Sequence, residues 1–301
     1  MARIAFIGVG TMGLSMAKNL VTKGFAVTAY DVNPEAVRTA AAAGMAAAGS
    51  AAEAVATADL VITMLPSSPH VESVYTGDGG VLLAARKGTL CVDMSTIDPG
   101  VSRRVAAAAA ERGLRFMDAP VSGGVPRAAE GTLTIMVGGS PADFDEAFPA
   151  LSAMGANVIR VGPVGSGEVV KLCNNLIAGV AAVAVSEAFR IAEGFGVDPR
   201  IVTEVIAKSS GHTWVMEHMH PVPGLAPKAA STNGYQPGFM TDLMCKDLGL
   251  AVDAARALRI PVFTAPAAQQ LYRLASSHGL GRKDFTSVYT LLKPSADTAP
   301  V

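Results

Sequence analysis

The stretch that most constrains the fold is residues 3–31, which read RIAFIGVGTMGLSMAKNLVTKGFAVTAYD. A short apolar run of strand length is followed by a glycine-rich turn, an amphipathic helical pattern and a second apolar run. Gly8, Gly10 and Gly13 have G-x-G-x-x-G spacing between the first run and the helix. This spacing allows a tight turn, close approach of a pyrophosphate to the backbone, and close packing of helix on strand. The stretch therefore predicts a nucleotide-binding strand–turn–helix–strand unit.

The charges around this unit favour one type of nucleotide. A diphosphate would sit on the free N–H groups at the positive helix start, so Thr11 and Met12 are included as cofactor-binding residues. Asp31 closes the second strand, where a carboxylate accepts hydrogen bonds from ribose hydroxyls and repels a 2′-phosphate. These features predict NAD rather than NADP, with Arg38 interpreted as a solvated helix residue. The alternative is a glycine-rich turn in an ordinary α/β unit.

Strand-like and helical segments alternate through the first half of the chain. Strands are expected at residues 4–7, 25–30, 60–65, 89–93, 115–118, 132–138 and 157–161. This alternation predicts an α/β fold with a doubly wound, mostly parallel Rossmann sheet. Ligands bind beyond the carboxyl ends of such strands. Loops carrying Pro66, Ser95-Thr96 and Ser122-Gly123-Gly124 are expected to converge there.

Beyond residue 162 the pattern becomes helical. Helices are expected at 165–195, 199–209, 242–258 and 266–278, and a Pro/Gly-rich loop at 212–238 is long enough to favour a functional role. We expect a dinucleotide-binding domain at 1–162 and an all-α domain at 163–301, joined by the long helix 165–195. Because that helix is apolar all round, it predicts burial against a partner subunit in a homo-oligomer, either a dimer or a tetramer.

Composition excludes several classes of partner. The chain of 301 residues is 50% hydrophobic and 16% charged, which suits a buried sheet and two domains. A net charge of −1 gives no electrostatic footprint for nucleic acid or an anionic membrane. The most apolar late stretch, 176–185, is too short to span a bilayer. The histidines lack carboxylate or cysteine partners at ligand spacing, so no metal site is expected.

Cysteine usage and the start of the sequence indicate a compartment. The three cysteines, Cys91, Cys173 and Cys245, are far apart and odd in number, which predicts reduced thiols. The first strand begins almost at once, so no targeting segment is expected. Together these features predict a cytoplasmic protein.

Two groups of residues have the chemistry of a catalytic site. Lys171 and Asn175 lie four residues apart, on one face of the long helix. Desolvation and the positive helix start disfavour the charged form of such a lysine, which can then exchange a proton near neutral pH. Ser122-Gly123-Gly124 offers a hydroxyl and backbone N–H groups for a small carboxylate. The alternatives are a surface lysine and a plain turn.

Three further residues are candidates at the same site. Lys246 could reach a cofactor ribose or phosphate, and Asp247 could hold a lysine ammonium. The alternative is an exposed ion pair of little energetic weight. Trp214, the single tryptophan, lies in the Pro/Gly-rich loop and is interpreted as either core or the wall of a substrate pocket.

Four long motifs, at 6–20, 118–133, 165–175 and 246–251, together resemble the signatures of the β-hydroxyacid dehydrogenase family over essentially the whole chain. Segments 210–224 and 283–288 resemble its hydroxyisobutyrate branch. The resemblance implies NAD-dependent oxidation of a small hydroxycarboxylic acid, with Lys171 as general acid/base.

The resemblance also implies roles at single positions. Substrate binding is expected at Ser122, Gly123, Gly124 and Asn175, with Trp214 as a pocket candidate. Cofactor contacts are expected at Leu65, Pro66, Thr96, Phe239 and Lys246, and Asp247 is expected to orient Lys171. One alternative is a family member that acts on tartronate, glyoxylate or succinic semialdehyde, usually with NADPH. The other is a dinucleotide-binding oligomer without catalysis.

Overall fold

The computed structural model describes residues 2–293, and the chain forms two compact units that divide between Lys171 and Leu172. Unit 1 is built on a nine-stranded sheet with the order β3-β2-β1-β4-β5-β6-β8-β7, and β9 pairs with β8. The strands are β1 (Arg3–Ile7), β2 (Ala26–Tyr30), β3 (Ala46–Ala47), β4 (Leu60–Thr63), β5 (Leu90–Asp93), β6 (Arg115–Asp118), β7 (Val121–Ser122), β8 (Leu133–Gly138) and β9 (Gly155–Gly162).

The sheet is parallel from β3 to β6. β8 and β9 run in the opposite direction, because β8 pairs antiparallel with β6 and β7 and parallel with β9. A mostly parallel sheet with crossover helices is the predicted doubly wound arrangement, and the fold class is confirmed.

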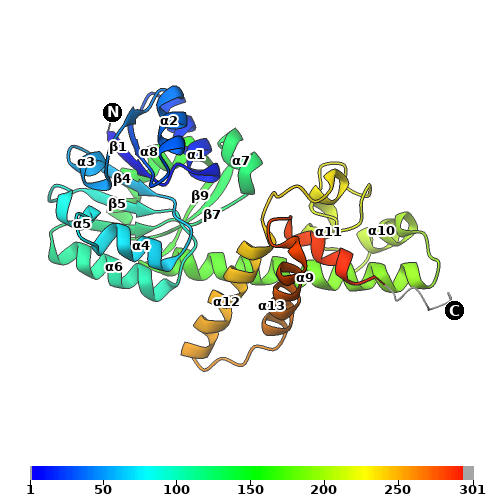
Figure 1. Cartoon of the computed structure of the whole chain (residues 1–301). Helices are drawn as coiled ribbons and strands as arrows, with labels where there is room; N and C mark the ends of the chain where they lie inside the picture. The colour runs from blue at the N-terminus through cyan, green and yellow to red at the C-terminus, as the bar shows by residue number, and fades with distance from the viewer. Residues whose placement is uncertain (1, 294–301) are drawn as a thin grey trace. The chain divides into compact units, whose positions relative to one another are not determined.

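Eight helices of unit 1 connect these strands (Figure 1). They are α1 (Thr11–Thr22), α2 (Pro34–Ala42), α3 (Ala51–Val55), α4 (Ser68–Thr76), α5 (Val81–Ala84), α6 (Pro99–Glu111), α7 (Gly124–Glu130) and α8 (Pro141–Met154). Several begin at a polar side chain that accepts a hydrogen bond from a free backbone N–H of the first turn, as Asn33, Asp98 and Ser140 do.

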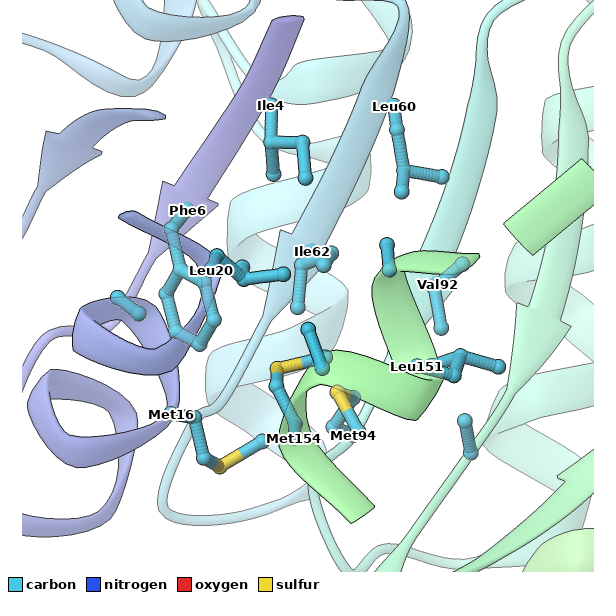
Figure 2. Packing of buried hydrophobic residues seen from close by; sticks show 14 of the residues in the cluster. Ile4, Phe6, Met16, Leu20, Leu60, Ile62, Val92, Met94, Leu151 and Met154 are labelled. Atoms are coloured by element: carbon cyan, nitrogen blue, oxygen red, sulfur yellow. The ribbon is translucent and has the colours of Figure 1, made fainter. Parts of the chain in front are cut away.

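The core of unit 1 has two layers, one on each face of the sheet. Helices α1, α2, α7 and α8 cover one face, and α3 to α6 cover the other. Because side chains alternate along a strand, Ile4 and Phe6 of β1 enter the first layer while Ala5 and Ile7 enter the second. Figure 2 shows the first layer, where strand residues meet side chains of α1 and α8 such as Met16 and Leu151. Both layers leave the carboxyl ends of the strands to the loops.

Unit 2 is helical. Its elements are the greater part of α9 (Ser166–Gly194), then α10 (Pro199–Ala207), α11 (Trp214–His218), η1 (Ala230–Asn233), α12 (Thr241–Ala257), α13 (Thr264–Ala275), η2 (Ser276–Leu280) and η3 (Phe285–Leu291). Between residues 172 and 293 the only β pairing is an isolated bridge from Met240 to Asp284. The main core packs α9, α12, α13 and η3 around Tyr272 and Phe285, and the Tyr272 hydroxyl donates to the Gly179 carbonyl at 2.9 Å.

Helix α9 is unusually apolar for its length. Among residues 2–293 it is the one helix long and apolar enough to cross a membrane by length and composition, a test that core helices of soluble proteins also pass. It carries buried polar side chains, Glu168, Lys171 and Asn175, in its first three turns. Lys171 and Asn175 are two of the residues predicted from the sequence for the catalytic site.

Candidate active site

The glycine-rich turn between β1 and α1 has the shape of a phosphate cradle. Gly8 has a φ of +90°, and a Cβ there would lie 2.3 Å from the Met64 carbonyl oxygen. A Cβ on Gly13 would lie 1.9 Å from the Gly8 carbonyl oxygen. A Cβ on Gly10 would meet nothing within 4 Å. The first and third glycines are therefore required by packing, whereas the second borders open space that a pyrophosphate can use.

The start of α1 fits an anion. Gly10 is the N-cap, no side chain caps the helix, and its first turn contains no acidic residue. The backbone N–H groups at Thr11 and Met12 therefore point, with the positive end of the helix dipole, toward the turn. The residues present thus fit the diphosphate of a dinucleotide.

The other predicted cofactor residues of unit 1 follow neighbouring strands of the same sheet. Asp31 comes directly after β2, and its Oδ1 accepts a hydrogen bond from the Asn33 N–H at 2.8 Å. Arg38 forms an exposed ion pair with Glu35, which confirms its interpretation as a solvated helix residue. A carboxylate at the end of β2, with its nearest candidate cation already paired, is the arrangement that favours a free ribose 2′-hydroxyl.

Leu65 and Pro66 follow β4, and Thr96 lies three residues after the end of β5. Because β2, β1, β4 and β5 are adjacent and parallel, their carboxyl ends bring these loops to one edge of the sheet. The predicted cofactor residues of unit 1 therefore lie at one edge of its sheet.

The predicted acid-binding loop lies where β7 meets α7. Ser122 ends β7 and is half-buried, and Gly124 begins α7. Gly123 between them has a φ of +139°, and a Cβ there would lie 2.8 Å from Arg127 Cβ. Only glycine fits this conformation, so the loop is more constrained than an ordinary turn.

Two buried carboxylates hold the beginning of α9, which carries Lys171. Asp118, the last residue of β6, accepts hydrogen bonds from the Gly165 N–H at 2.6 Å and from the Glu168 N–H at 2.9 Å. Glu168 in turn accepts a hydrogen bond from the Ile97 N–H at 3.1 Å. Burial raises the pKa of the Asp118 carboxyl, while the backbone N–H donors oppose that rise. The first turn of α9 is thereby attached to the loops after β5 and β6.

Lys171 is only 5% exposed, which rules out the surface lysine considered from the sequence. A buried amine has its charged form disfavoured by desolvation. Lys171 lies one turn beyond Glu168, in the part of α9 that hydrogen bonds to Asp118 and from the Ile97 N–H hold against unit 1.

Unit 2 brings three of the predicted residues together. Asn175 Nδ2 donates to Asp247 Oδ2 at 2.5 Å, and Lys246 Nζ lies 3.2 Å from Asp247 Oδ1. Asn175 is 5% and Asp247 2% exposed, so this cluster is not the exposed ion pair considered from the sequence. Whether Asp247 orients Lys171 stays a prediction.

The two aromatic candidates lie in different surroundings. Phe239 precedes α12, and its N–H donates to Asp284 Oδ2 at 3.0 Å, which fixes the backbone there. Trp214 begins α11, is 54% exposed and stacks on His218 with ring centroids 4.7 Å apart. Trp214 is therefore not a core residue. Its place in a substrate pocket stays a prediction.

Sequence reasoning missed the buried carboxylates Asp93, Asp118 and Glu168, of which Asp118 and Glu168 hold the start of α9. Asp93 and Asp118 each end an apolar strand, and such a terminal acid is a signal that could have drawn attention to them. Their partners could not be read from the sequence, because Asp118 binds N–H groups 47 and 50 residues away. Among residues 2–293 no cluster of three or more potential metal ligands is found.

Comparison with known proteins places this geometry in a family. Residues 3–162 match the family described as the NAD binding domain of 6-phosphogluconate dehydrogenase. Residues 165–292 match the family described as NAD-binding of NADP-dependent 3-hydroxyisobutyrate dehydrogenase. The two matches together span nearly all of the chain.

Individual relatives agree over the full length. The chain is 43% identical to mitochondrial 3-hydroxyisobutyrate dehydrogenase of Rattus norvegicus, over 96% of this chain and 87% of the relative. It is also 43% identical to an NAD-dependent L-serine dehydrogenase of Pseudomonas aeruginosa, over 98% of this chain and 99% of the relative. A solved structure of Mycobacterium tuberculosis 3-hydroxyisobutyrate dehydrogenase with L-serine is 42% identical and has a TM-score of 0.93, and the match covers 98% of this chain and 100% of that one. The chain belongs to the β-hydroxyacid dehydrogenase family and is an NAD-dependent oxidoreductase.

Proposed function

We propose that the chain oxidises 3-hydroxyisobutyrate to methylmalonate semialdehyde, a step of valine catabolism, with Lys171 as the general acid/base. The support for this substrate is the similarity to 3-hydroxyisobutyrate dehydrogenases at 42–43% identity over nearly the whole chain. Asp31 at the end of β2 supports NAD as the coenzyme, since a carboxylate there repels a 2′-phosphate.

The observation that carries the proton transfer is the burial of Lys171, which is 5% exposed at the anchored start of α9. In its neutral form the amine can accept the hydroxyl proton of the substrate at Nζ. As the O–H bond breaks, the carbinol carbon gains a double bond to oxygen and loses its hydrogen as hydride. NAD, when bound, supplies the acceptor for that hydride.

The remaining residues bind and orient. The carboxylate of the substrate is assigned to Ser122, Gly123 and Gly124, whose backbone conformation leaves N–H groups for an anion. Asn175 is assigned to the substrate as a hydrogen-bond donor, and Asp247 to the charged form of Lys171. Holding the reacting groups in this way converts an encounter into an oriented reaction, which is the main contribution of the protein.

Replacing Lys171 tests the proton transfer. Lys171→Ala is expected to lower kcat by about 10²–10⁴-fold, the usual contribution of a general acid/base, while the dissociation constant for NADH stays within about twofold. The matched control is Lys208→Ala directly after α10, because the Lys208 side chain is 74% exposed and pairs with Glu204. This variant should leave turnover unchanged. Near-normal turnover of Lys171→Ala would remove this residue from the mechanism.

A second candidate substrate is L-serine. An NAD-dependent L-serine dehydrogenase is among the relatives at 43% identity, and the M. tuberculosis structure is of the enzyme with L-serine. L-serine is also a 3-hydroxy acid, and it carries an ammonium group where 3-hydroxyisobutyrate has a methyl group. The same lysine chemistry applies to both, so the distinction depends on whether the site accepts an apolar or a charged substituent.

We also infer a homo-oligomer, a dimer or a tetramer, assembled through α9 and α10, and a cytoplasmic location. Large apolar side chains on these helices are exposed in the single chain, with Ile177 at 67%, Ile191 at 64% and Val205 at 58%. Large apolar side chains exposed along two consecutive helices favour an interaction surface there. The three cysteines are unpaired with one another, which supports a reducing compartment.

A further inference from the structure

A continuous chain of buried and part-buried hydrogen bonds crosses the carboxyl ends of β4 and β5. Thr63 and Asp93 are the last residues of these strands and are in register. Asp93 Oδ1 accepts hydrogen bonds from Thr63 Oγ1 at 2.6 Å and from Ser95 Oγ at 2.6 Å. Ser95 Oγ accepts a hydrogen bond from the Leu65 N–H at 2.8 Å, and the Tyr75 hydroxyl lies 3.1 Å from Thr63 Oγ1. One carboxylate oxygen is therefore the meeting point of two loops.

The direction of every bond in this chain follows from chemistry. A carboxylate oxygen can only accept, so the hydroxyls of Thr63 and Ser95 both donate to Asp93. Ser95 then has a lone pair for the Leu65 N–H, and Thr63 has one for the Tyr75 hydroxyl. Replacing a single hydroxyl would leave a buried donor or acceptor without its partner, which usually costs more than the bond itself contributes.

The backbone of the sheet does not require this carboxyl group. The strands β4 and β5 are already paired in parallel register, and the Met94 N–H donates to the Thr63 carbonyl at 2.8 Å just beyond that pairing. Asp93 is fully buried, and its Oδ2 has no hydrogen-bond partner among residues 2–293. A buried carboxyl with one oxygen unsatisfied is a cost that fold stability alone would not favour.

The loops that Asp93 joins are those that carry the predicted cofactor contacts. Leu65 and Pro66 follow Thr63 on one strand, and Thr96 follows Ser95 on the other. The first loop also supports the glycine-rich turn, because a Cβ on Gly8 would lie 2.3 Å from the Met64 carbonyl oxygen and 3.1 Å from Leu65 Cδ2. Fixing the Leu65 N–H therefore fixes the wall against which the phosphate turn packs.

We propose that Asp93 is a positioning residue for NAD, holding the loop after β4 and the loop after β5 in their binding conformation through Thr63 and Ser95. The proposal rests on the cofactor contacts of Leu65, Pro66 and Thr96 in the proposed function. Asp93 acts through these loops and does not itself take part in hydride or proton transfer.

The test measures NADH binding without substrate, by titrating the fluorescence of NADH with each purified full-length variant. Ser95→Ala and Thr63→Val each remove one hydroxyl at nearly constant volume. Each is expected to raise the dissociation constant for NADH roughly tenfold, the effect of one unsatisfied buried group. Thr63→Ser keeps the hydroxyl and is expected to restore most of the affinity that Thr63→Val loses.

The matched control is Ser102→Ala on α6. The Ser102 hydroxyl is fully buried in the same unit and has no hydrogen-bond partner among residues 2–293. Its removal is expected to leave the dissociation constant within about twofold, because no bond is lost. The KM for the hydroxy acid at saturating NAD should change less than the KM for NAD in Ser95→Ala and Thr63→Val.

Two results would overturn the proposal. One is wild-type affinity for NADH in Ser95→Ala and Thr63→Val. The other is a lower melting temperature in both variants, together with KM values for NAD and for the hydroxy acid that rise in proportion, because this indicates a general structural role. Failure of both variants to fold while Ser102→Ala folds counts as this second result. The titration contains no hydroxy acid, so its result does not depend on which substrate the chain oxidises. An unexpected substrate would contradict the proposed function but not the role of Asp93.

Discussion

At the scale of single residues, the glycines and Asp31 could be predicted, whereas the buried acids could not. The spacing of Gly8, Gly10 and Gly13 implies a turn whose geometry is nearly independent of the rest of the chain, and the structure has that turn. Asp93 looks like any acid at the end of a strand until its neighbours are known. Its partners Thr63 and Ser95 are recognisable only once β4 and β5 lie side by side.

The titration of Asp93 gives a pH-dependent prediction. Burial raises the pKa of this carboxyl from 3.8 to about 6, the charge of Asp118 adds to the rise, and hydrogen bonds from Ser95 and Thr63 oppose it. The folded chain then binds this proton more tightly than the unfolded chain. The contribution of this proton to the free energy of unfolding is therefore fully present below about pH 4 and is lost as the pH rises through about 6.

Asp93→Asn cannot titrate, so the difference between the two proteins isolates this group. The free energy of unfolding of the wild type minus that of Asp93→Asn is expected to fall as the pH rises from about 4 to about 6 and to level off above that. The fall is at most about 1.4 kcal/mol for each unit by which the pKa of the folded chain exceeds that of the unfolded chain. Urea unfolding across this range measures it. A difference that is constant, or that rises with pH, would contradict the assigned protonation.

At the scale of elements, patterns identified most strands and helices, and the omissions have physical causes. Helix α8 contains Pro149, which lacks an N–H and interrupts the helical signal, yet it packs against the sheet through Leu151 and Met154. The reversed direction of β8 was not predicted, because a strand of hydrophobic residues has the same pattern in either direction. The short β7 was absorbed into the loop that precedes α7.

The phosphate turn allows a paired test at this scale. Gly13→Ala is expected to destabilise the fold by more than about 2 kcal/mol, because its Cβ would lie 1.9 Å from the Gly8 carbonyl oxygen. Gly10→Ala is expected to fold with a loss of no more than about 1 kcal/mol, because its Cβ meets nothing within 4 Å. Its methyl group would instead occupy the space left for the pyrophosphate.

Gly10→Ala should therefore weaken NADH binding at least about tenfold while its urea midpoint stays close to that of the wild type. Fluorescence titration and urea unfolding of the same sample separate the two effects. If Gly10→Ala binds NADH normally, the diphosphate does not approach the chain at this glycine.

At the scale of the whole molecule, the division into an α/β unit and a helical unit was predictable because the hydrophobic period changes along the chain. The sequence also predicts that a second copy of the chain covers α9, because the helix is apolar all round. Ile177 and Ile191 remain exposed in the single chain. The proposed oligomer accounts for them.

Charge placed on that face tests the oligomer. Ile177→Glu combined with Ile191→Glu is expected to lower the molecular mass in solution toward that of one chain, because two buried charges would oppose association. Leu83→Glu on α5, which is 53% exposed in unit 1, is the control and should leave the mass unchanged. Light scattering coupled to size exclusion measures both. A wild type that is already monomeric would contradict the oligomer.

The proposed substrate and coenzyme are tested together by kcat/KM for 3-hydroxyisobutyrate, L-serine and tartronate in oxidation, and for glyoxylate and succinic semialdehyde in reduction, each with the NAD and the NADP form of the coenzyme. We expect kcat/KM for 3-hydroxyisobutyrate with NAD to exceed that of every other combination at least about tenfold, a difference of roughly 1.4 kcal/mol. We also expect Asp31→Ala to reduce the difference in kcat/KM between NAD and NADP. A higher kcat/KM for any other acid, or for NADP, would contradict the proposed function.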